Sequence, residues 1–161
     1  MSIFNPDTPH PVLHLVSCVS MKLERAAPTP AKDLYCSQWF KLARKVMEQR
    51  GEPWGILSAE YGLLDVDAMI FAYDKTLNTM TSAERRIWAE DRVLCFMPPA
   101  DRYVIWAGER YAEFLAGPLK AELPLKGLGI GRQLAHLTRL VRGVDALPAM
   151  QSMRLCDAAG S

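Results

Sequence analysis

The sequence predicts an α/β protein, a three-layer αβα sandwich around a four-stranded and mostly parallel sheet. Short apolar segments, which are typical of strands buried on both faces, alternate along the chain with longer segments of helical periodicity. Alternation of this kind produces a parallel sheet that helices cover on both faces. The length of 161 residues fits one domain, and no internal repeat or low-complexity tract is visible.

Four segments have the short apolar pattern of buried strands. They are residues 12–18, 54–59, 103–107 and 122–125. His14 lies inside the first segment, where we expect a core histidine with a satisfied hydrogen bond rather than a ligand. Residues 60–80 follow the second strand as a long loop, and a loop of this length in a compact domain indicates function or disorder. Its three aromatic residues and several aliphatic ones argue against disorder.

Helices are predicted between the strands from their periodicity and from signals at their ends. Residues 31–50 place apolar side chains on one helical face, and Gly51 ends this helix. Thr81 and Glu84 form a capping box that begins a second helix, which runs to about residue 96. Two more helices are expected, over residues 109–120 and from the glycine-rich segment at 127–131 to about residue 142. Residues 1–11 are expected to be an irregular arm, residues 12–143 the single α/β domain, and residues 144–161 a loose tail.

Composition and charge exclude several classes of protein. Half of the residues are hydrophobic and 23% are charged, as in ordinary globular proteins. The net charge of +1 argues against a histone-like protein that binds nucleic acid by charge alone, but it leaves room for a local basic patch. The four cysteines form no CxxC pair, and the three histidines show no ligand spacing relative to them. We therefore expect free thiols in a reducing compartment, and neither a metal nor a cofactor.

The sequence also bears on localisation. No apolar run approaches the roughly 18 residues of a membrane span. The N-terminal stretch MSIFNPDTPHP lacks the basic and apolar regions of a signal peptide. These features predict a cytoplasmic protein without a membrane partner.

The segments that follow the predicted strands are candidates for a binding site. In open α/β sheets, ligands bind beyond the carboxyl ends of the strands, so residues 17–22, 58–74, 108–111 and 126–133 should converge. The first segment offers Ser17, Cys18, Ser20 and Lys22. These residues form either a binding site or a turn whose hydroxyls bond their own backbone. Glu109 either complements the dipole of the helix that it begins or binds a ribose or base donor.

A glycine-rich segment before the last helix predicts a phosphate site. Gly127, Gly129 and Gly131 stand at alternate positions, so the backbone can approach a ligand closely and present free amides at a helix N-terminus. Arg132 in the first turn opposes the helix dipole unless an anion lies between it and these amides. The segment is neither the full dinucleotide fingerprint nor a P-loop. The alternative is a glycine-rich turn with a surface arginine.

The long loop carries the candidate catalytic residues, Asp74 and Tyr61. A carboxylate such as Asp74 can act as a general base or stabilise the oxocarbenium-like sugar that forms when an N-glycosidic bond breaks. Tyr61 and Tyr73 can stack on a base. Ser58 stands outside a GxSxG motif and has no evident histidine partner, which argues against a serine hydrolase and leaves Ser58 a binding role. The alternative for Asp74 is an aspartate that caps a turn of the loop.

Six stretches together resemble a small bacterial and phage family of unassigned function. They are LVSCVSMKL, DLYCSQWFKLAR, WGILSAEYGLLD, AYDKTLN, AGERYAEFL and PLKGLGIGRQLAHL. They occur in this order and account for nearly all of residues 12–140.

A shorter stretch, LSAEYGLLDVDAMIFAYDKTL, is similar to two other groups of proteins. YaaA-type peroxide-stress proteins carry a comparable LSGxYGLL followed by a PY segment and are described as DNA-binding, whereas Ala72 stands here in place of that proline. Archaeosine-type tRNA modification enzymes carry a similar SAxYG stretch. The predicted topology also resembles the uracil-DNA glycosylase fold, but the GxDPY and HPS motifs of those enzymes are absent from this sequence.

These resemblances imply a protein that processes nucleic acid or nucleotides. The most concrete expectation is an N-glycosylase-like enzyme that acts on a modified base in DNA, with Asp74 assisting bond cleavage and the two tyrosines holding a flipped base. Lys22, Arg132 and the amides of residues 129–131 would then hold phosphates. The alternative expectation is a non-catalytic DNA-binding protein of stress response or phage–host conflict. DNA or a nucleotide is the expected partner, and the sequence names no protein partner.

Overall fold

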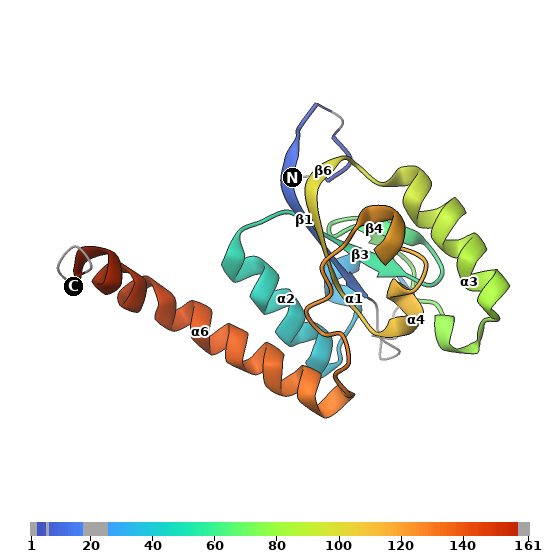
Figure 1. Cartoon of the computed structure of the whole chain (residues 1–161). Coiled ribbons are helices and arrows are strands. Elements are labelled where there is room, and N and C mark those ends of the chain that lie inside the picture. The colour runs from blue at the N-terminus through green and yellow to red at the C-terminus, as the bar shows by residue number, and fades with distance from the viewer. Residues whose placement is uncertain (1–2, 6, 18–25, 158–161) are drawn as a thin grey trace.

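The chain folds around a four-stranded sheet with the strand order β4-β3-β1-β6 (Figure 1). The structure, a computed structural model, describes residues 3–5, 7–17 and 26–157, with the backbone alone for residues 144–157. The strands are β1 (His10–Ser17), β3 (Trp54–Ser58), β4 (Gly62–Asp65) and β6 (Ala100–Trp106). The central strand β1 is parallel to β3 and β6, whereas β4 is antiparallel to β3. The predicted α/β class with a four-stranded, mostly parallel sheet is confirmed.

The identity of the fourth strand differs from the prediction. Residues 122–125 contribute a single parallel bridge between Glu122 and Val104 instead of a strand. The Glu122 amide donates to the carbonyl of Tyr103, and the Glu122 carbonyl accepts from the amide of Ile105, each at 2.9 Å. The pairing ends there because Pro124, two residues later, has no N–H to donate to the neighbouring strand.

The strand that completes the sheet, β4, comes from the segment that was predicted to be a loop. Gly62 makes the connection between β3 and β4 possible, since its φ of 75° lies in the left-handed region that favours glycine. Ser58 pairs with Gly62 and Leu57 with Leu63, so the two strands form a tight hairpin. Leu63 and Leu64 are both buried, which explains why this short segment stays on the sheet.

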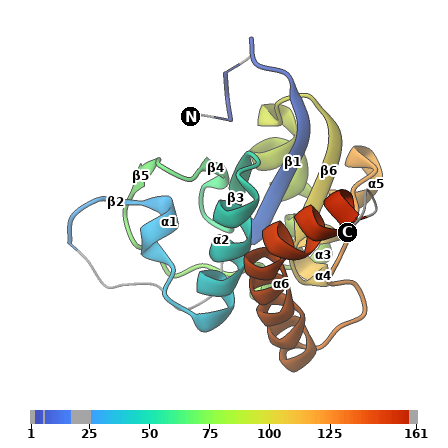
Figure 2. The same ribbon diagram turned by 90° about the vertical axis from the view of Figure 1, so that its left-hand side faces the viewer.

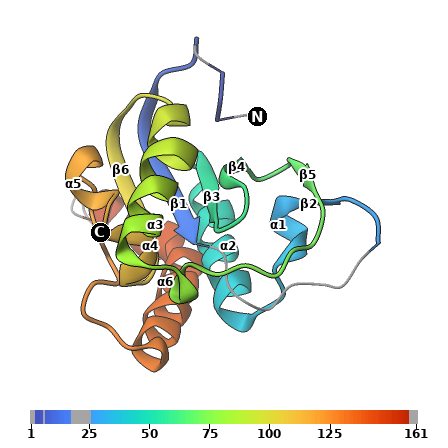
Figure 3. The same ribbon diagram turned by 90° about the vertical axis from the view of Figure 1, so that its right-hand side faces the viewer.

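Helices cover both faces of the sheet. On one face, α2 (Gln38–Arg50) packs against α6 (Ile130–Asp157), as Figure 2 shows. On the other face lie α3 (Ser82–Trp88) and α4 (Glu109–Ala112), which Figure 3 shows in front of the sheet. The sheet therefore lies between two helical layers.

The predicted helix over residues 31–50 is interrupted near its start. It consists of α1 (Ala31–Leu34) and α2. The break follows from the extended backbone of Tyr35 and from Ser37, whose side chain accepts a hydrogen bond from the Phe40 amide at 3.1 Å and so begins a new helix. Gly51 ends α2 in the left-handed conformation, as predicted.

The second predicted helix begins as expected and changes character later. The capping box is confirmed, because Thr81 accepts from the Glu84 amide and the Glu84 carboxylate accepts from the Thr81 amide. After α3 the chain continues as a π-helical turn (Ala89–Val93) and a 3₁₀ turn (Leu94–Phe96). These two turns extend the helical layer along the β3–β4 hairpin.

The remaining elements are short, except for the last helix. A two-stranded antiparallel sheet pairs β2 (Thr29–Pro30) with β5 (Met69–Ile70), and a 3₁₀ turn spans Leu77–Thr79. The predicted helix at 109–120 is split into α4 and α5 (Ala116–Leu119). Helix α6 continues through residues 144–157, where a loose tail was expected. No helix within the described residues combines the length and the apolar character that a membrane crossing needs.

Candidate functional site

The carboxyl ends of the three parallel strands meet at one edge of the sheet. Ser17 ends β1 opposite Leu57 of β3, and Val16 lies opposite Trp106 of β6. The ends of these strands therefore lie side by side, as the topology predicted.

A cleft of about 450 Å³ opens at this edge, and we call it the edge cleft. Its lining comes from β1, α2, the loop before α3, α4 and the first turn of α6. The side chains that bear on chemistry are Ser17, Trp39, Glu109, Arg110, Tyr111 and Gln133. Two predicted site residues, Ser17 and Glu109, thus meet the end of the glycine-rich segment.

A second, smaller pocket adjoins the edge cleft, and we call it the glycine pocket. It measures about 250 Å³ and is bounded by Lys126 and by residues 127–129 of the glycine-rich segment, with Leu123 and Leu125 as apolar walls. Gly108, Glu109 and Gln133 line both cavities. Glu109 and Gln133 therefore lie at the boundary between a larger and a smaller compartment.

Gln133 is held in a fixed orientation at this junction. Its Oε1 accepts a hydrogen bond from the indole N–H of Trp39 at 3.0 Å, and its Nε2 donates to the Leu128 carbonyl at 2.8 Å. These two bonds connect α2, α6 and the glycine-rich segment. The amide keeps one further N–H and one further lone pair for a ligand.

The predicted residues Ser58, Tyr61 and Tyr73 lie together, but they do not line the edge cleft. Ser58 is 0% exposed, and its hydroxyl donates to the Tyr73 hydroxyl at 2.8 Å while accepting from the Tyr61 amide at 3.1 Å. The Tyr73 hydroxyl also forms a hydrogen bond with the Tyr35 hydroxyl, at 2.8 Å. The rings of Tyr61 and Tyr73 meet edge to face at 5.5 Å. This network anchors the loop that brings Thr76 to the edge cleft.

Asp74 does not join these groups. Its side chain is exposed, it is not part of the edge cleft, and it makes no hydrogen bond or ion pair with any residue that the structure describes. Gly129 lines the glycine pocket, whereas Gly131 and Arg132 lie exposed at the start of α6 outside both cavities. The predicted residues Cys18, Ser20 and Lys22 lie outside the described part of the chain.

Eight residues of the edge cleft were not predicted as individual site residues. Five of them lie in segments that were expected to converge, namely Gly108, Arg110, Tyr111, Ile130 and Gln133. The other three, Trp39, Thr76 and Asn78, lie outside those segments and carried no signal in the sequence. The helical periodicity assigned Trp39 to the core, and its burial agrees with that, but its indole N–H also fixes Gln133.

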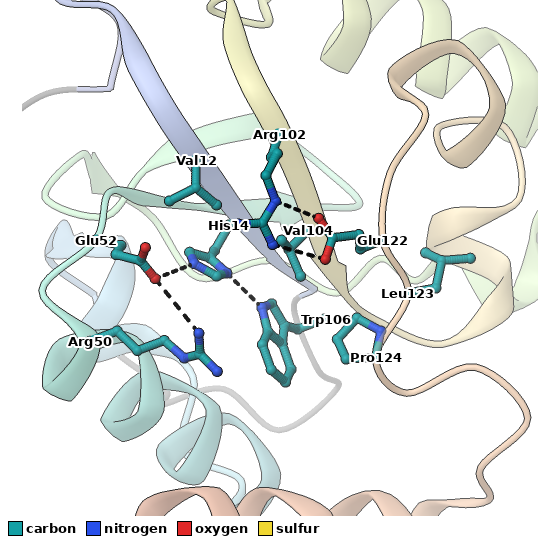
Figure 4. A pocket seen from close by; sticks show the side chains of 10 residues that line it. All are labelled: Val12, His14, Arg50, Glu52, Arg102, Val104, Trp106, Glu122, Leu123 and Pro124. Carbon is teal, nitrogen blue, oxygen red and sulfur yellow. Dashed lines mark hydrogen bonds and ion pairs between the residues drawn. The ribbon is translucent and has the colours of Figure 1, made fainter. Parts of the chain in front are cut away.

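A separate pocket of about 440 Å³ lies on the face of the sheet, and we call it the sheet-face pocket (Figure 4). Its floor includes His14 of β1, which is 2% exposed. His14 Nδ1 accepts a hydrogen bond from the indole N–H of Trp106, and its Nε2 donates to Glu52, both at 2.9 Å. Burial lowers the pKa of His14 and outweighs the opposite influence of Glu52, so the ring is neutral. The expected core histidine is confirmed, with two hydrogen bonds.

None of these three cavities contains a metal-binding group of described residues. Among the residues that the structure describes, no group of three or more histidine, cysteine, aspartate or glutamate side chains is arranged to hold a metal ion. The chemistry available at the edge cleft is that of a carboxylate, a guanidinium, hydroxyls, amides and aromatic rings.

Comparison with known protein families identifies a relationship for this chain. A family of unknown function, DUF6884, matches residues 13–139, which include every strand of the sheet except the first residues of β1. No curated protein and no solved structure matches the chain significantly. Since the match extends over most of its length, the chain belongs to the DUF6884 family of unknown function.

Proposed function

We propose that the protein acts on a nucleotide unit, most concretely as an N-glycosylase-like enzyme for a modified base in DNA. The observation that carries this proposal is the position of Glu109 at the junction of two adjoining cavities. A nucleotide unit has two parts, a base and a sugar phosphate, and the N-glycosidic bond joins them. A carboxylate between the two compartments would face that bond.

The lining of the two cavities supports this division. The glycine pocket is small and mostly apolar, and with Lys126 and Gln133 at its border it suits a planar base. The edge cleft is larger and carries the hydroxyl of Ser17 and the guanidinium of Arg110, which suit a sugar and a phosphate. Tyr111 and Trp39 add aromatic surface to its wall.

The proposed reaction is hydrolysis of the bond between the base nitrogen and C1′ of the sugar. As this bond breaks, its electron pair leaves with the base, which takes up a proton, and positive charge develops on the sugar. The Glu109 carboxylate stabilises that charge, and the oxygen of a water molecule then bonds to C1′ and loses its proton. Because Asp74 lies outside the edge cleft, we assign to Glu109 the role that the sequence suggested for Asp74.

The test is an assay for abasic sites. Oligonucleotides with uracil, hypoxanthine or alkylated bases are incubated with the protein and heated in alkali, and free nucleotides are assayed for released base. We expect cleavage by the wild type and a loss of about a hundredfold or more in the Glu109→Gln variant, since one charge-stabilising group is removed from the transition state. Asp74→Asn should retain activity. Activity lost in Asp74→Asn and kept in Glu109→Gln would reverse the assignment, and no product from any substrate would refute hydrolysis.

A second candidate function, non-catalytic binding of DNA, is favoured by the charge of the C-terminal segment. Between residues 123 and 144 the chain has no acidic residue, but it has four basic ones: Lys126, Arg132, Arg139 and Arg142. The three arginines are exposed on α6, and none forms an ion pair with a described residue. A pure binder would shift DNA in a salt-dependent manner without forming product, and Glu109→Gln would leave that binding intact.

A further inference from the structure

The sheet-face pocket is built around a histidine that holds other side chains in place. Both ring nitrogens of His14 are engaged, one by the Trp106 indole and one by Glu52. His14 therefore has no free nitrogen with which to act on a ligand. Neighbouring positions of the same strand are filled by Val12, Leu13 and Leu15, so an apolar side chain would satisfy the packing alone. The effect of the histidine is to fix the Glu52 carboxylate and the Trp106 ring.

Arg50 and Glu52, which carry opposite charges, lie side by side on the wall of the pocket next to His14 (Figure 4). The guanidinium of Arg50 is 5.7 Å from the centre of the Trp106 ring, and its Nη1 is 3.7 Å from Glu52 Oε1. That separation exceeds hydrogen-bonding distance, so the two groups attract but do not satisfy each other. Both side chains are about one-third exposed, at 34% and 37%. No described residue accepts a hydrogen bond from the Arg50 guanidinium.

On the opposite wall of the pocket, the charged groups bind each other. Arg102 donates two hydrogen bonds to Glu122, at 2.8 and 3.0 Å, and this bidentate pair leaves little capacity for a ligand. Between the walls lie apolar side chains, namely Val12, Val104, Leu123 and Pro124. With two arginines, two glutamates and a neutral histidine, the pocket has no net charge. It therefore does not favour a simple anion or a simple cation.

From this geometry we infer that the sheet-face pocket binds a small zwitterion of the α-amino acid class with an apolar side chain. The ligand carboxylate would bond to Arg50, and its ammonium group would bond to the oxygen of Glu52 that His14 leaves free. Neighbouring charges of opposite sign match the adjacent ammonium and carboxylate groups of an α-amino acid. The apolar side chain would lie on Val104 and Leu123. This site is independent of the edge cleft and of the function proposed for it.

The test uses leucine and two derivatives that each lack one charge, N-acetyl-leucine and leucine methyl ester. Binding is followed by ¹⁵N NMR through the indole N–H signals of the four tryptophans. We expect leucine to shift the Trp106 signal saturably and to leave the Trp39 signal at the edge cleft unchanged. Each derivative should bind about tenfold more weakly or worse, because it cannot form one of the two charge-assisted hydrogen bonds. No saturable shift with leucine, or equal affinity for all three compounds, would overturn the inference.

Variants separate a ligand site from a structural ion pair. Glu52→Gln keeps an oxygen that can accept from His14 but loses the charge, so the free protein should retain its Trp106 signal while leucine affinity falls at least about tenfold. Arg50→Gln should have the same effect on affinity. Glu109→Gln, in the edge cleft, is the control and should bind leucine like the wild type. Unchanged leucine affinity in both Glu52→Gln and Arg50→Gln would refute the assignment.

Discussion

At the scale of single residues, His14 shows how a polar group can occupy the centre of a buried strand. Its ring is 2% exposed, yet a donor on Trp106 and an acceptor on Glu52 satisfy both nitrogens. This arrangement fixes the neutral tautomer that carries the proton on Nε2. If Nδ1 were protonated, its N–H would face the indole N–H of Trp106. Burial also disfavours the positive charge of the protonated ring.

This lowered pKa makes stability depend on pH. The unfolded chain takes up a proton near its ordinary pKa of 6.5, whereas the folded protein does so only at lower pH. Between the two pKa values the unfolded state binds more protons, so the stability that a neutral His14 provides is complete above pH 6.5 and is lost as the pH falls below it. We expect the stability difference between wild type and His14→Gln to shrink between pH 7 and pH 5, as measured by urea unfolding. A constant difference would show that His14 does not titrate in this way.

Sequence position indicated the neighbourhood of the candidate site but not the exposure of each side chain. Ser17 and Glu109 could be placed because a parallel topology brings the ends of its strands together. Ser58 and Asp74 come from one long segment, yet Ser58 is fully buried and Asp74 is exposed. Their difference depends on contacts such as the bond between Ser58 and Tyr73, 15 residues apart, which no local pattern reveals.

At the scale of secondary-structure elements, the β3–β4 hairpin depends on one glycine. Gly62 has a φ of 75°, and a Cβ at this position would overlap the backbone carbonyl of Arg92 in the π-helical turn. Arg92 also donates from its guanidinium to the Glu60 carbonyl at 2.9 Å. The π-helical turn and the hairpin therefore pack backbone to backbone, and this packing places Trp88 where its indole N–H donates to the Ser58 carbonyl.

We expect Gly62→Ala to destabilise the protein by about 3 kcal/mol. The left-handed backbone accounts for roughly 1–2 kcal/mol, and displacement of the packed π-helical turn adds about 1–3 kcal/mol. Urea unfolding measures the change. The control is Gly117→Ala, where a Cβ meets no atom within 4 Å and the backbone is not left-handed, so its effect should stay within about 1 kcal/mol. Equal effects of the two substitutions would contradict the close packing at Gly62.

Elements with strong local signals could be predicted, and those fixed by distant contacts could not. The capping box at Thr81, the glycine end of α2 and three of the four strands follow from residues within a few positions of each other. Strand β4 is short and its side chains do not alternate between buried and exposed, and its pairing depends on the turn at Gly62. The break between α1 and α2 depends on the extended backbone of Tyr35 and on the Ser37 cap, and the apolar periodicity of the whole segment gave no sign of either.

At the scale of the whole molecule, charge is distributed unevenly although the net charge is only +1. Many basic side chains in the body of the protein are neutralised by nearby carboxylates. Among the residues that the structure describes, lysine and arginine form the ion pairs Lys32–Asp67, Arg44–Asp33, Arg44–Glu48, Arg50–Glu52, Arg85–Glu113 and Arg102–Glu122. The arginines of α6 differ, because the surrounding stretch contains no acidic residue. Helix α6 also supplies Gln133 to the edge cleft, so its positive charge lies on an element of the candidate site.

This distribution predicts how salt should affect nucleic-acid binding. If α6 contacts phosphates, the logarithm of the binding constant for a single-stranded oligonucleotide should fall linearly with the logarithm of the salt concentration. Replacing Arg139 and Arg142 with glutamine should reduce the magnitude of that slope by about 1.4, or about 0.7 for each phosphate that is no longer neutralised. Fluorescence anisotropy across a range of salt concentrations measures this slope.

The matched control removes two positive charges elsewhere. Arg86 on α3 and Lys120 after α5 are exposed and belong to elements other than α6, and their replacement by glutamine changes the net charge equally. Because only released counterions at the contact surface enter the slope, this control should leave the slope nearly unchanged. An equal reduction in both double variants would show that α6 has no special role and that overall charge governs binding. A different outcome is that the salt slope changes only in the Arg139 and Arg142 double variant, while that variant binds a mononucleotide like the wild type. In that case, α6 contacts phosphates of a nucleic-acid strand that extends beyond the edge cleft.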